Sequence, residues 1–333
     1  MAAKKSVTVI SYGLGPIGQA TARHLLSQPD LRLVGAVDID PSKKGKTVGQ
    51  LLGEPKLSGV IIRDDAESVL RETSPHVVLH TTASWLQDVE KQLLQILDGG
   101  CHVVSSTEEL AYPPLVAGVG VAKRLNERAL AKGRAVLPVG VNPGFVMDHV
   151  CLEVARCCLR VDRVTAERRV DATKRRGPLQ KKIGSGMTVA EFEAEKGRGR
   201  LGHAGFRESV GLIAHRLGWE LDGVEMTIEP VIARAPVRTE HVKVEPGQVA
   251  GIDQTAVGRK GARDVIRLHI IMSVDGIDPV DEVRIEGDPP LVCRFVGGIP
   301  GDQATVALLV DGARRVGRLR PGLLTPSGDP LFS

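Results

Sequence analysis

The stretch VTVISYGLGPIG, residues 7–18, decides the fold of the N-terminal half. Its first six residues are mostly β-branched or aromatic and predict a strand, and a GxGxxG pattern with a helix follows directly. The three pattern glycines have different purposes. Gly13 permits a tight turn, Gly15 lets the backbone approach a pyrophosphate, and Gly18 allows close packing of helix on strand. The order of strand, glycine turn and helix predicts a dinucleotide-binding site of the Rossmann type.

An acidic residue completes this pattern. Asp38 lies 20 residues after Gly18, at the end of a second predicted strand over 31–37, and can accept hydrogen bonds from the adenine ribose hydroxyls. The helix that starts at Pro16 and Ile17 presents its positive dipole end to the phosphates. Lys43 and Lys44 follow closely and could meet a 2′-phosphate, so NAD, NADP or both remain open. The alternative is a glycine-rich turn that binds no ligand.

Strands alternate with helices up to about residue 140. Further strands are predicted at 60–62, 77–81, 102–105 and 135–139, with helices at 66–72, 85–97 and 116–131. Ser84 is the predicted N-cap of the second of these helices. Several strands are apolar on both faces, which is typical of a parallel sheet covered by helices on both sides. Thr81 and Thr82 end the fourth strand at the ligand-binding edge, either as cofactor contacts or in turn and capping chemistry.

The pattern changes after about residue 145. Helices are predicted at 145–159, 188–195 and 207–217, and strands at 227–233, 241–246, 264–274 and 280–287. A mostly antiparallel sheet with a few helices follows from this order. A last helix is predicted over 302–316, with Asp302 as its cap. We therefore expect an α/β protein: a Rossmann domain with a parallel sheet at 1–145, an α+β substrate-binding and dimerisation domain at 146–300, and a C-terminal segment, 301–333, packed on the first domain.

Composition excludes several classes of function. The net charge of the 333-residue chain is only +4 and aromatic residues make up 3%, so a nucleic-acid-binding stripe is not expected. No run approaches 18 apolar residues, and residues 1–5 lack the apolar core of a leader, so we expect neither a membrane span nor secretion. The five cysteines show no CxxC spacing, which indicates reduced thiols in a cytoplasm. The histidines show no metal-ligand spacing, and His80 is interpreted as a buried core residue.

The segment SSTEEL, residues 105–110, follows the fifth strand and places carboxylates at the same edge. A carboxylate there could act as a general acid and base or hold an ammonium ion. Both Ser105 with Glu108 and Ser106 with Glu109 also match a capping box, which is the structural alternative. Two adjacent glutamates allow one to cap a helix while the other faces the cleft.

Long segments of the chain resemble a known family. They are SSTEEL (105–110), GVNPGFVMD (140–148), RVDATKRRGPLQKKIGSGMT (169–188), RESVGLIAHRLGWELD (207–222), VEPGQVAGI (244–252) and GDQATVALLVDGARRV…PGLLT (301–325). These segments look like 2,4-diaminopentanoate dehydrogenase and are similar to the bacterial native amine dehydrogenases. The two-domain plan more distantly resembles dihydrodipicolinate reductase.

The resemblance implies oxidation of an amine by hydride transfer to NAD(P), release of ammonia, and in reverse the reductive amination of a ketone. The family's catalytic glutamate falls on Glu108, and Asn142 would lie beside the nicotinamide and the substrate. Phe145 and Val146 would line the substrate pocket. Some amine dehydrogenases of this group have Trp-Pro at these two positions. The Phe-Val pair of this sequence instead looks like that of the diaminopentanoate enzymes, which favours a polar substrate with a carboxylate.

Basic residues in the 171–188 loop agree with such a substrate. Lys174 and Lys182 are candidate carboxylate ligands, although a solvated charged loop explains each of them alone. The turn at 184–188 could hold an anion with its backbone N–H groups, or simply start a helix capped by Ser185. A homodimer is expected from the resemblance. The alternatives are an amino-acid dehydrogenase or imine reductase on the same scaffold, or a dinucleotide-sensing protein without turnover.

Overall fold

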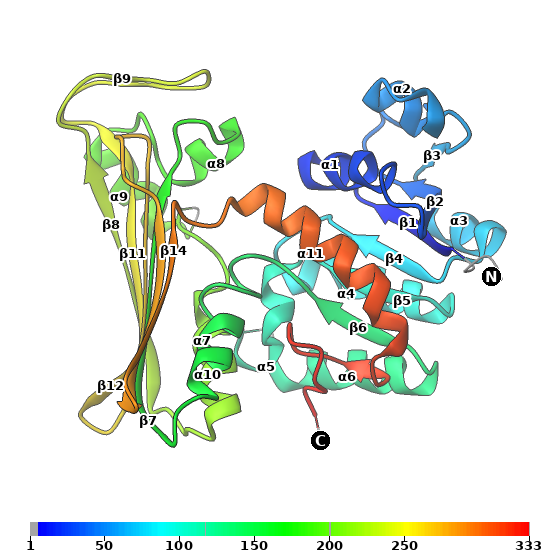
Figure 1. Cartoon of the computed structure of the whole chain (residues 1–333). Helices are drawn as coiled ribbons and strands as arrows, with labels where there is room; N and C mark the ends of the chain where they lie inside the picture. Colours follow the sequence, from blue (N-terminus) through cyan, green and yellow to red (C-terminus); the bar gives the residue numbers. More distant parts are fainter. Residues whose placement is uncertain (1–5, 117, 200, 333) are drawn as a thin grey trace. The chain divides into compact units, whose positions relative to one another are not determined.

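The computed structural model describes residues 6–116, 118–199 and 201–332. The chain divides into two compact units, Met1–Gly144 with Pro300–Ser333, and Phe145–Ile299 (Figure 1). Residues 1–5, which carry the prediction about a leader, lie outside the described residues. None of the helices described is long and apolar enough to cross a membrane.

A parallel sheet forms the centre of the first unit. Its described strands follow the order β15-β6-β5-β4-β1-β2-β3. They are β1 (Val7–Tyr12), β2 (Leu31–Val37), β3 (Ile62–Arg63), β4 (Val77–His80), β5 (His102–Ser105), β6 (Ala135–Pro138) and β15 (Gly322–Leu323). The chain runs outward from β1 to β3 on one side and from β4 to β6 on the other. The reversal between β1 and β4 is the point at which open sheets of this kind bind ligands, at the carboxyl ends of the strands.

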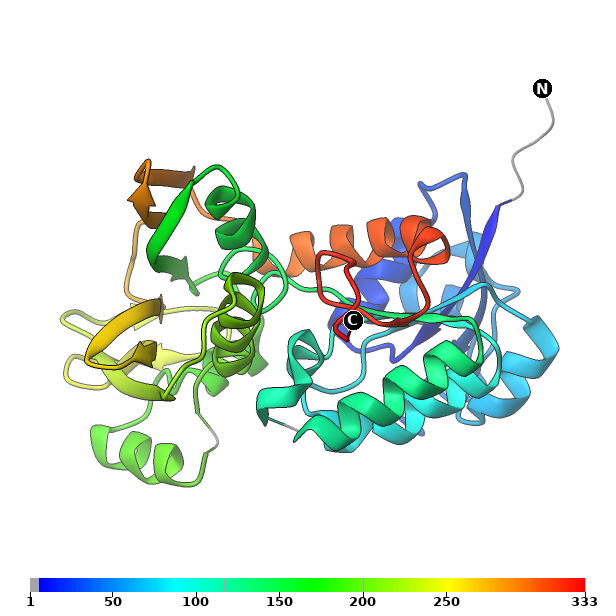
Figure 2. The ribbon, with the colours of Figure 1, turned by 90° about the horizontal axis from the view of Figure 1, so that it is seen from below.

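Helices cover both faces of this sheet, as the doubly apolar strands predict. One face carries α1 (Pro16–Leu25) and α11 (Gly301–Arg315), and the other carries α3 (Ala66–Thr73), α4 (Leu86–Asp98) and α6 (Gly118–Ala131). Figure 2 shows α11 and α6 on opposite faces. Neighbouring residues of β1 enter different hydrophobic cores. Val9 packs in the core under α1 and α11, and Ile10 packs in the core under α3, α4 and α6. Shorter elements complete the unit: α2 (Val48–Leu52), η1 (Pro55–Leu57), η2 (Glu108–Ala111), α5 (Pro113–Val116) and η3 (Val316–Arg318).

Two predicted helix caps are wrong. The N-cap of α4 is Trp85 rather than Ser84, and the first N–H of the helix is capped from a distant residue described below. The N-cap of α11 is Pro300, so Asp302 lies in the first turn, where its charge favours the helix dipole. The helix predicted over 116–131 is α6, preceded by the short α5, and residue 117 lies outside the described residues.

The second unit holds a mixed sheet, which in the described residues has the order β14-β13-β7-β12-β11-β8. Its strands are β7 (Arg160–Asp171), β8 (Gly223–Ile232), β11 (Val249–Lys260), β12 (Arg263–Ser273), β13 (Val280–Asp288) and β14 (Leu291–Val296). All neighbours pair antiparallel except β7 and β12, which are parallel. The predicted fold class, a parallel Rossmann sheet plus a mostly antiparallel α+β domain, is confirmed.

The remaining elements of the second unit surround this sheet. Helices α7 (His149–Ala155) and α10 (Phe206–Leu217) pack against its strands. The other elements are α8 (Gly177–Lys182), α9 (Val189–Gly197), β9 (Val237–Arg238) and β10 (Lys243–Val244). The helix predicted over 145–159 is only the short α7, because residues 143–148 form turns and the chain enters β7 at residue 160.

Candidate active site

The carboxyl ends of five adjacent strands bring the predicted cofactor residues of the first unit to one edge. In the order β2, β1, β4, β5 and β6, the strands lead into Asp38, the glycine loop, Thr81 with Thr82, Glu108, and Asn142. Neighbouring strands lie about 4.8 Å apart, so Asp38 and Glu108 are separated by roughly 14 Å along the edge. A dinucleotide is an extended ligand, and this linear array suits its length.

The glycine loop between β1 and α1 has no room for side chains at two of its three pattern glycines. Gly13 has a φ of 93°, in the left-handed region, and a Cβ at Gly18 would lie 2.0 Å from the Gly13 carbonyl oxygen. A Cβ at Gly15, by contrast, would meet no described atom within 4 Å. The first two constraints hold the turn closed, and the third position leaves open space beside the start of α1.

Thr81 braces this loop from the neighbouring strand. Its hydroxyl donates to the carbonyl oxygen of Gly13 at 2.9 Å, and its N–H donates to the carbonyl oxygen of Tyr12 at 2.8 Å. The Thr82 hydroxyl also has protein partners, since it lies 3.0 Å from Nε2 of His80 and donates to the Gln92 carboxamide at 3.0 Å. Both threonine side chains are therefore engaged within the protein, as the turn-chemistry alternative predicts.

Asp38 connects the end of β2 to the glycine loop. Its Oδ2 accepts the Leu14 N–H at 2.7 Å and the Lys43 ammonium at 2.9 Å, while Oδ1 accepts the Asp40 N–H at 2.9 Å. Lys43 also lies 3.5 Å from Asp40, and Lys44 pairs with Asp64 at 2.6 Å. Asp38 and Lys43 thus form an ion pair at the end of β2, and Lys44 is directed to another partner.

The two adjacent glutamates after β5 have different surroundings. Glu109 accepts the Leu86 N–H at 2.6 Å and so caps α4, and its own N–H donates to the Ser84 carbonyl oxygen at 3.2 Å. Glu108 is half-buried, and its Oε2 has no hydrogen-bond partner among the described residues. Neither local capping box forms, because Ser105 bonds to Thr107 and the Glu109 carboxylate bonds to Leu86. Glu109 caps a helix, and the Glu108 carboxylate is left for a ligand. The sequence allows for this division between the two glutamates.

Asn142 lies in the turn that follows β6. Its side chain is buried, and neither its amide nitrogen nor its oxygen has a hydrogen-bond partner among the described residues. The turn itself depends on glycine, because Gly144 has a φ of 120° and a Cβ there would lie 2.8 Å from backbone atoms of Gly140. A buried carboxamide with both polar ends unpaired is costly unless a ligand supplies partners.

In the second unit, the two residues predicted to line the substrate pocket lie in the turns just before α7. Val146 is fully buried and Phe145 is half-buried, with the Phe145 ring 6.0 Å from that of His149. Asp148, at the N-cap of α7, accepts the Ser209 hydroxyl at 2.8 Å. This bond fixes the segment against α10.

Gln180 organises the basic loop of the second unit. Its side chain is buried, and Nε2 donates to the carbonyl oxygens of Ala172, Thr173 and Arg175 at 2.9 to 3.2 Å. Its Oε1 accepts the Thr239 hydroxyl at 2.7 Å. Lys174, on this turn, is exposed, and Lys182, at the end of α8, is half-buried. The loop that carries these candidate residues is therefore held from beneath.

The predicted anion nest at 184–188 is wrong. The N–H groups of residues 184–187 all donate to backbone carbonyl oxygens, and that of Thr188 donates to Glu191 at 2.8 Å. The helix cap is Thr188, which forms a capping box with Glu191, whereas the Ser185 hydroxyl donates to the Ala250 carbonyl oxygen at 3.0 Å. No N–H group of the turn is left for an anion.

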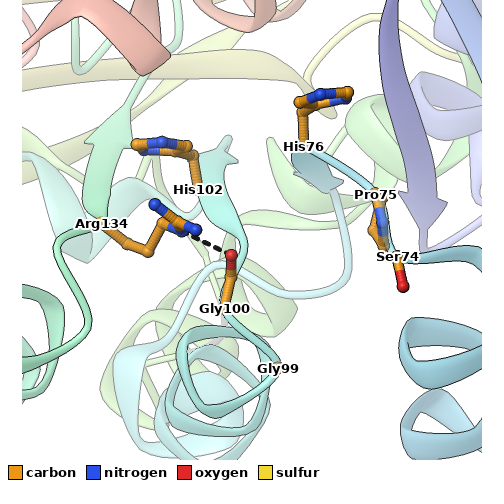
Figure 3. Close-up of a pocket in the computed structure, with 7 residues that line it drawn as sticks. All are labelled: Ser74, Pro75, His76, Gly99, Gly100, His102 and Arg134. Atoms are coloured by element: carbon orange, nitrogen blue, oxygen red, sulfur yellow. Dashed lines mark hydrogen bonds between the residues drawn. The ribbon is translucent and has the colours of Figure 1, made fainter.

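The amino edge of the parallel sheet is also hollowed. A cavity of about 320 Å³ is lined by Ser74, Pro75, His76, Gly99, Gly100, His102 and Arg134 (Figure 3). Arg134 donates to the Gly100 carbonyl oxygen at 2.5 Å, and the Ala135 N–H donates to Nδ1 of His102 at 3.1 Å. These bonds satisfy carbonyl and N–H groups at the ends of α4 and β6, so they stabilise the fold at this edge.

Sequence reasoning missed the polar residues that hold the site in place. Gln92, Thr107 and Gln180 each bond to a segment distant in sequence, and no local pattern marks such partners. His80 was correctly interpreted as a satisfied core residue. Burial lowers its pKa to about 4, and both of its ring nitrogens have hydrogen-bond partners.

Comparison with known proteins agrees with this architecture. Residues 145–331 match the model of the 2,4-diaminopentanoate dehydrogenase C-terminal domain. The chain is 30% identical to 2,4-diaminopentanoate dehydrogenase of Acetoanaerobium sticklandii, over 96% of this chain and 92% of that protein. The structure of an amine dehydrogenase from Mycobacterium smegmatis is similar, with a TM-score of 0.85 and 26% identity, over 98% of this chain and 97% of the other.

A more distant structure shares the fold alone. Dihydrodipicolinate reductase from Paenisporosarcina sp. TG-14 matches with a TM-score of 0.53 and 14% identity, over 95% of this chain and 96% of the other. The predicted family resemblance is confirmed by the family model and the relatives.

Proposed function

Because the chain belongs to the 2,4-diaminopentanoate dehydrogenase family and is an NAD(P)-dependent oxidoreductase, we propose that it is an amine dehydrogenase. Overall, a primary amine, water and the oxidised dinucleotide give a ketone, ammonia, the reduced dinucleotide and a proton. In reverse, the enzyme carries out the reductive amination of a ketone. The observation that carries the proposal is Glu108, whose Oε2 is buried without a partner among the described residues, on the edge that follows the glycine loop.

Two features of the first unit fit a dinucleotide. The open space at Gly15 suits a pyrophosphate, and the unpaired Asn142 carboxamide suits a polar ring substituent such as that of nicotinamide. We assign the pyrophosphate to Gly13, Gly15, Pro16, Ile17 and Gly18. The adenine ribose is assigned to Asp38 and Lys43, with Thr81 and Thr82 bordering the cofactor. The Asp38 carboxylate favours NAD and the adjacent ammonium of Lys43 tolerates NADP, so we expect both to be used.

When bound, the nicotinamide ring accepts a hydride from the carbon that bears the amine. In the proposed chemistry, Glu108 accepts a proton from the substrate ammonium, so that the nitrogen lone pair can form the imine. After releasing this proton to solvent, Glu108 takes a proton from the water that adds to the imine and returns it to the nitrogen. The nitrogen then leaves as ammonia while the hydroxyl on the same carbon loses its proton, which gives the ketone. Such a role requires a carboxylate that protein donors do not hold.

For the substrate, we propose an amine that also carries a carboxylate, such as a 2,4-diaminopentanoate-like compound. Asn142, Phe145 and Val146 are the proposed contacts of its carbon chain, and Lys174 and Lys182 the proposed ligands of its carboxylate. The exposed ammonium of Lys174, on a turn fixed by Gln180, supports this choice. A simple aliphatic amine is the other substrate class of this proposal.

We also propose that the enzyme works as a cytoplasmic homodimer formed through the sheet of the second unit. All five cysteines are free thiols, which agrees with a reducing compartment. Polar side chains alternate along the central strands of that sheet, for example Asp253 and His269, which pair at 2.8 Å. Sedimentation equilibrium tests the assembly: a dimer is expected, and a monomer at micromolar concentration would refute it.

The experiment follows absorbance of NADH and NADPH with a panel of ketones, with and without ammonium, under alkaline conditions that supply free ammonia. The panel contains 2-amino-4-oxopentanoate and simple ketones such as cyclohexanone. Oxidation that requires ammonium is expected, fastest with the carboxylate-bearing ketone. Oxidation without ammonium would instead indicate a ketone reductase, and turnover of only a cyclic imine would indicate an imine reductase.

A further inference from the structure

A buried chain of polar groups crosses the first unit beneath the proposed catalytic edge. His80, at the end of β4, is fully buried, and its Nε2 lies 2.9 Å from the carboxamide of Gln92 on α4. Its Nδ1 lies 2.9 Å from the hydroxyl of Ser105 at the end of β5. The Ser105 oxygen accepts the Thr107 N–H at 3.2 Å and lies 3.0 Å from the Thr107 hydroxyl, which donates to the Ala83 carbonyl oxygen at 2.9 Å. The chain thus links two strand ends, one helix and both following loops.

Acceptors at the two ends of this series fix its donors. Oε1 of Gln92 can only accept, so Nε2 of the neutral His80 ring carries the proton and Nδ1 accepts the hydroxyl of Ser105. The Ala83 carbonyl oxygen can also only accept, so the Thr107 hydroxyl donates to it, while the Thr107 N–H donates to the Ser105 oxygen at 3.2 Å. Burial, which lowers the pKa of His80 to about 4, keeps the ring in this neutral form.

This series of hydrogen bonds reaches the residues on either side of Glu108. Thr107 is bound to Ala83, and Glu109 is bound twice to the same segment, through its N–H to Ser84 and through its carboxylate to Leu86. The residues on both sides of Glu108 are thus attached to the loop after β4. Glu108 itself has a buried Oε2 without a partner among the described residues, so its position comes from these attachments.

We propose that His80 is a positioning residue for Glu108, which it acts on through Ser105 and Thr107. The inference rests on the proposed function, because it assumes that Glu108 exchanges protons with the substrate. A carboxylate whose buried oxygen has no partner among the described residues depends on its backbone for alignment, and small displacements of a reacting group reduce rates strongly. A core histidine that served stability alone would need no connection to this particular loop.

Three variants test this series of hydrogen bonds. His80→Leu removes both ring bonds, and Thr107→Val removes the hydroxyl with little change of shape. His80→Asn keeps an amide oxygen, an acceptor for Ser105, close to the position of Nδ1. We expect kcat to fall about 30-fold in His80→Leu and in Thr107→Val, and to stay within about threefold of the parent in His80→Asn. The dissociation constant of NADH, measured by fluorescence, should change less than about twofold, because the glycine loop and Asp38 lie on other strands.

A matched control is available on the same sheet. His102 is the other histidine whose pKa is lowered to about 4, chiefly by burial, and it lies at the amino edge. His102→Leu should lower the melting temperature while kcat of the folded enzyme remains unchanged. Should His80→Leu fail to fold, Thr107→Val carries the same test, because it leaves the imidazole in place.

A double-mutant cycle with Glu108→Ala separates positioning from general damage. If His80 acts through Glu108, adding His80→Leu to Glu108→Ala should change the residual single-turnover rate less than about twofold. A further 30-fold loss in that background, or unchanged kcat in both His80→Leu and Thr107→Val, would overturn the inference. Near-normal turnover of Glu108→Ala alone would instead refute the proposed function, whatever the His80 variants do.

Discussion

The two edges of the parallel sheet in the first unit carry similar residues with different surroundings. His80 ends β4 at the carboxyl edge, and His102 starts β5 at the amino edge. Burial is the main cause that lowers the pKa of each to about 4, with the charge of Arg134 adding to the effect on His102. His80 is bonded to side chains that lead to Glu108, whereas His102 accepts a backbone N–H and faces a cavity lined by helix ends. A lowered histidine pKa therefore reports burial, and only its partners connect it to a site.

The largest expected difference between the edges is in turnover. Glu108→Ala should lower kcat by about 10²- to 10⁴-fold, the usual contribution of a general acid and base, while NADH still binds. Arg134→Gln, in the cavity of the amino edge, should leave kcat unchanged. Steady-state rates and NADH fluorescence check both variants. A Glu108→Ala enzyme with near-normal rates would remove the main distinction between the edges.

The second largest expected difference between the carboxyl edge and the amino edge of the sheet is in cofactor affinity. A Cβ at Gly15 would meet no described atom within 4 Å but would enter the space assigned to the pyrophosphate. Gly15→Ala should therefore keep its stability and weaken NADH binding by about tenfold or more. Gly59, at the amino end of β3, is equally open, and Gly59→Ala is the matched control with unchanged affinity. Titration of NADH fluorescence gives both constants. Equal affinity in the two variants would contradict the assignment of the pyrophosphate.

Both histidines should make the stability of the protein depend on pH, although only His80 is bonded toward Glu108. The pKa of His80 is about 4 in the folded state and near 6.5 when unfolded, so the folded state binds fewer protons between these values. Its contribution is complete above pH 6.5 and is lost as the pH falls toward 4. From about pH 7.5 to about pH 5 the loss is roughly 2 kcal/mol, and His80→Asn should remove it. His102→Asn should remove a comparable part, because the pKa of that ring is also about 4 in the folded state.

Urea unfolding at the two pH values measures the loss in the free energy of unfolding for the parent and for each variant. The control is the parent protein under the same conditions, so that titration of all other groups cancels. An equal pH dependence in the parent and in His80→Asn would show that His80 gains its proton as easily in the folded state as in the unfolded chain.

The smallest expected effect concerns the choice of cofactor. Asp38→Asn keeps an acceptor for the Leu14 N–H but removes the charge that pairs with Lys43, which leaves this ammonium for a 2′-phosphate. We expect the ratio of kcat/KM for NADPH to that for NADH to rise about tenfold. Lys43→Met should move the ratio in the opposite direction. If this ratio changes in neither variant, Asp38 and Lys43 do not contact the adenine ribose of the cofactor.

Most strands of the first unit could be predicted from the sequence, although the two-residue β15 was not, and β3 lies at Ile62–Arg63 instead of 60–62. β1, β2 and β5 match the predicted bounds, because runs of Val, Ile and Leu that are buried on both faces differ clearly from helical spacing. The second unit was predicted less well. β7 carries the charged run AERR on an otherwise alternating strand, and β11 contains Gly, Asp and Gln, so neither shows the apolar signal of a strand.

The candidate site was predictable in its residues and not in its attachments. Asp38, Thr81 and Glu108 lie at the carboxyl edge because strands of a parallel sheet all end there. The bond from Glu109 to Leu86 joins residues 23 positions apart, and the bond from His80 to Ser105 joins residues 25 apart. Such partners depend on which strands are neighbours, and local patterns carry no such information.

Hydrogen–deuterium exchange with and without NADH is the most direct test that the carboxyl edge is the ligand edge. Peptides that cover residues 13–18, 38–43 and 106–109 should exchange more slowly when NADH is bound. Peptides over the cavity of the amino edge, residues 74–76, 99–102 and 133–134, should exchange at the same rate in both states. Protection confined to the amino edge, or spread equally over both, would contradict the account.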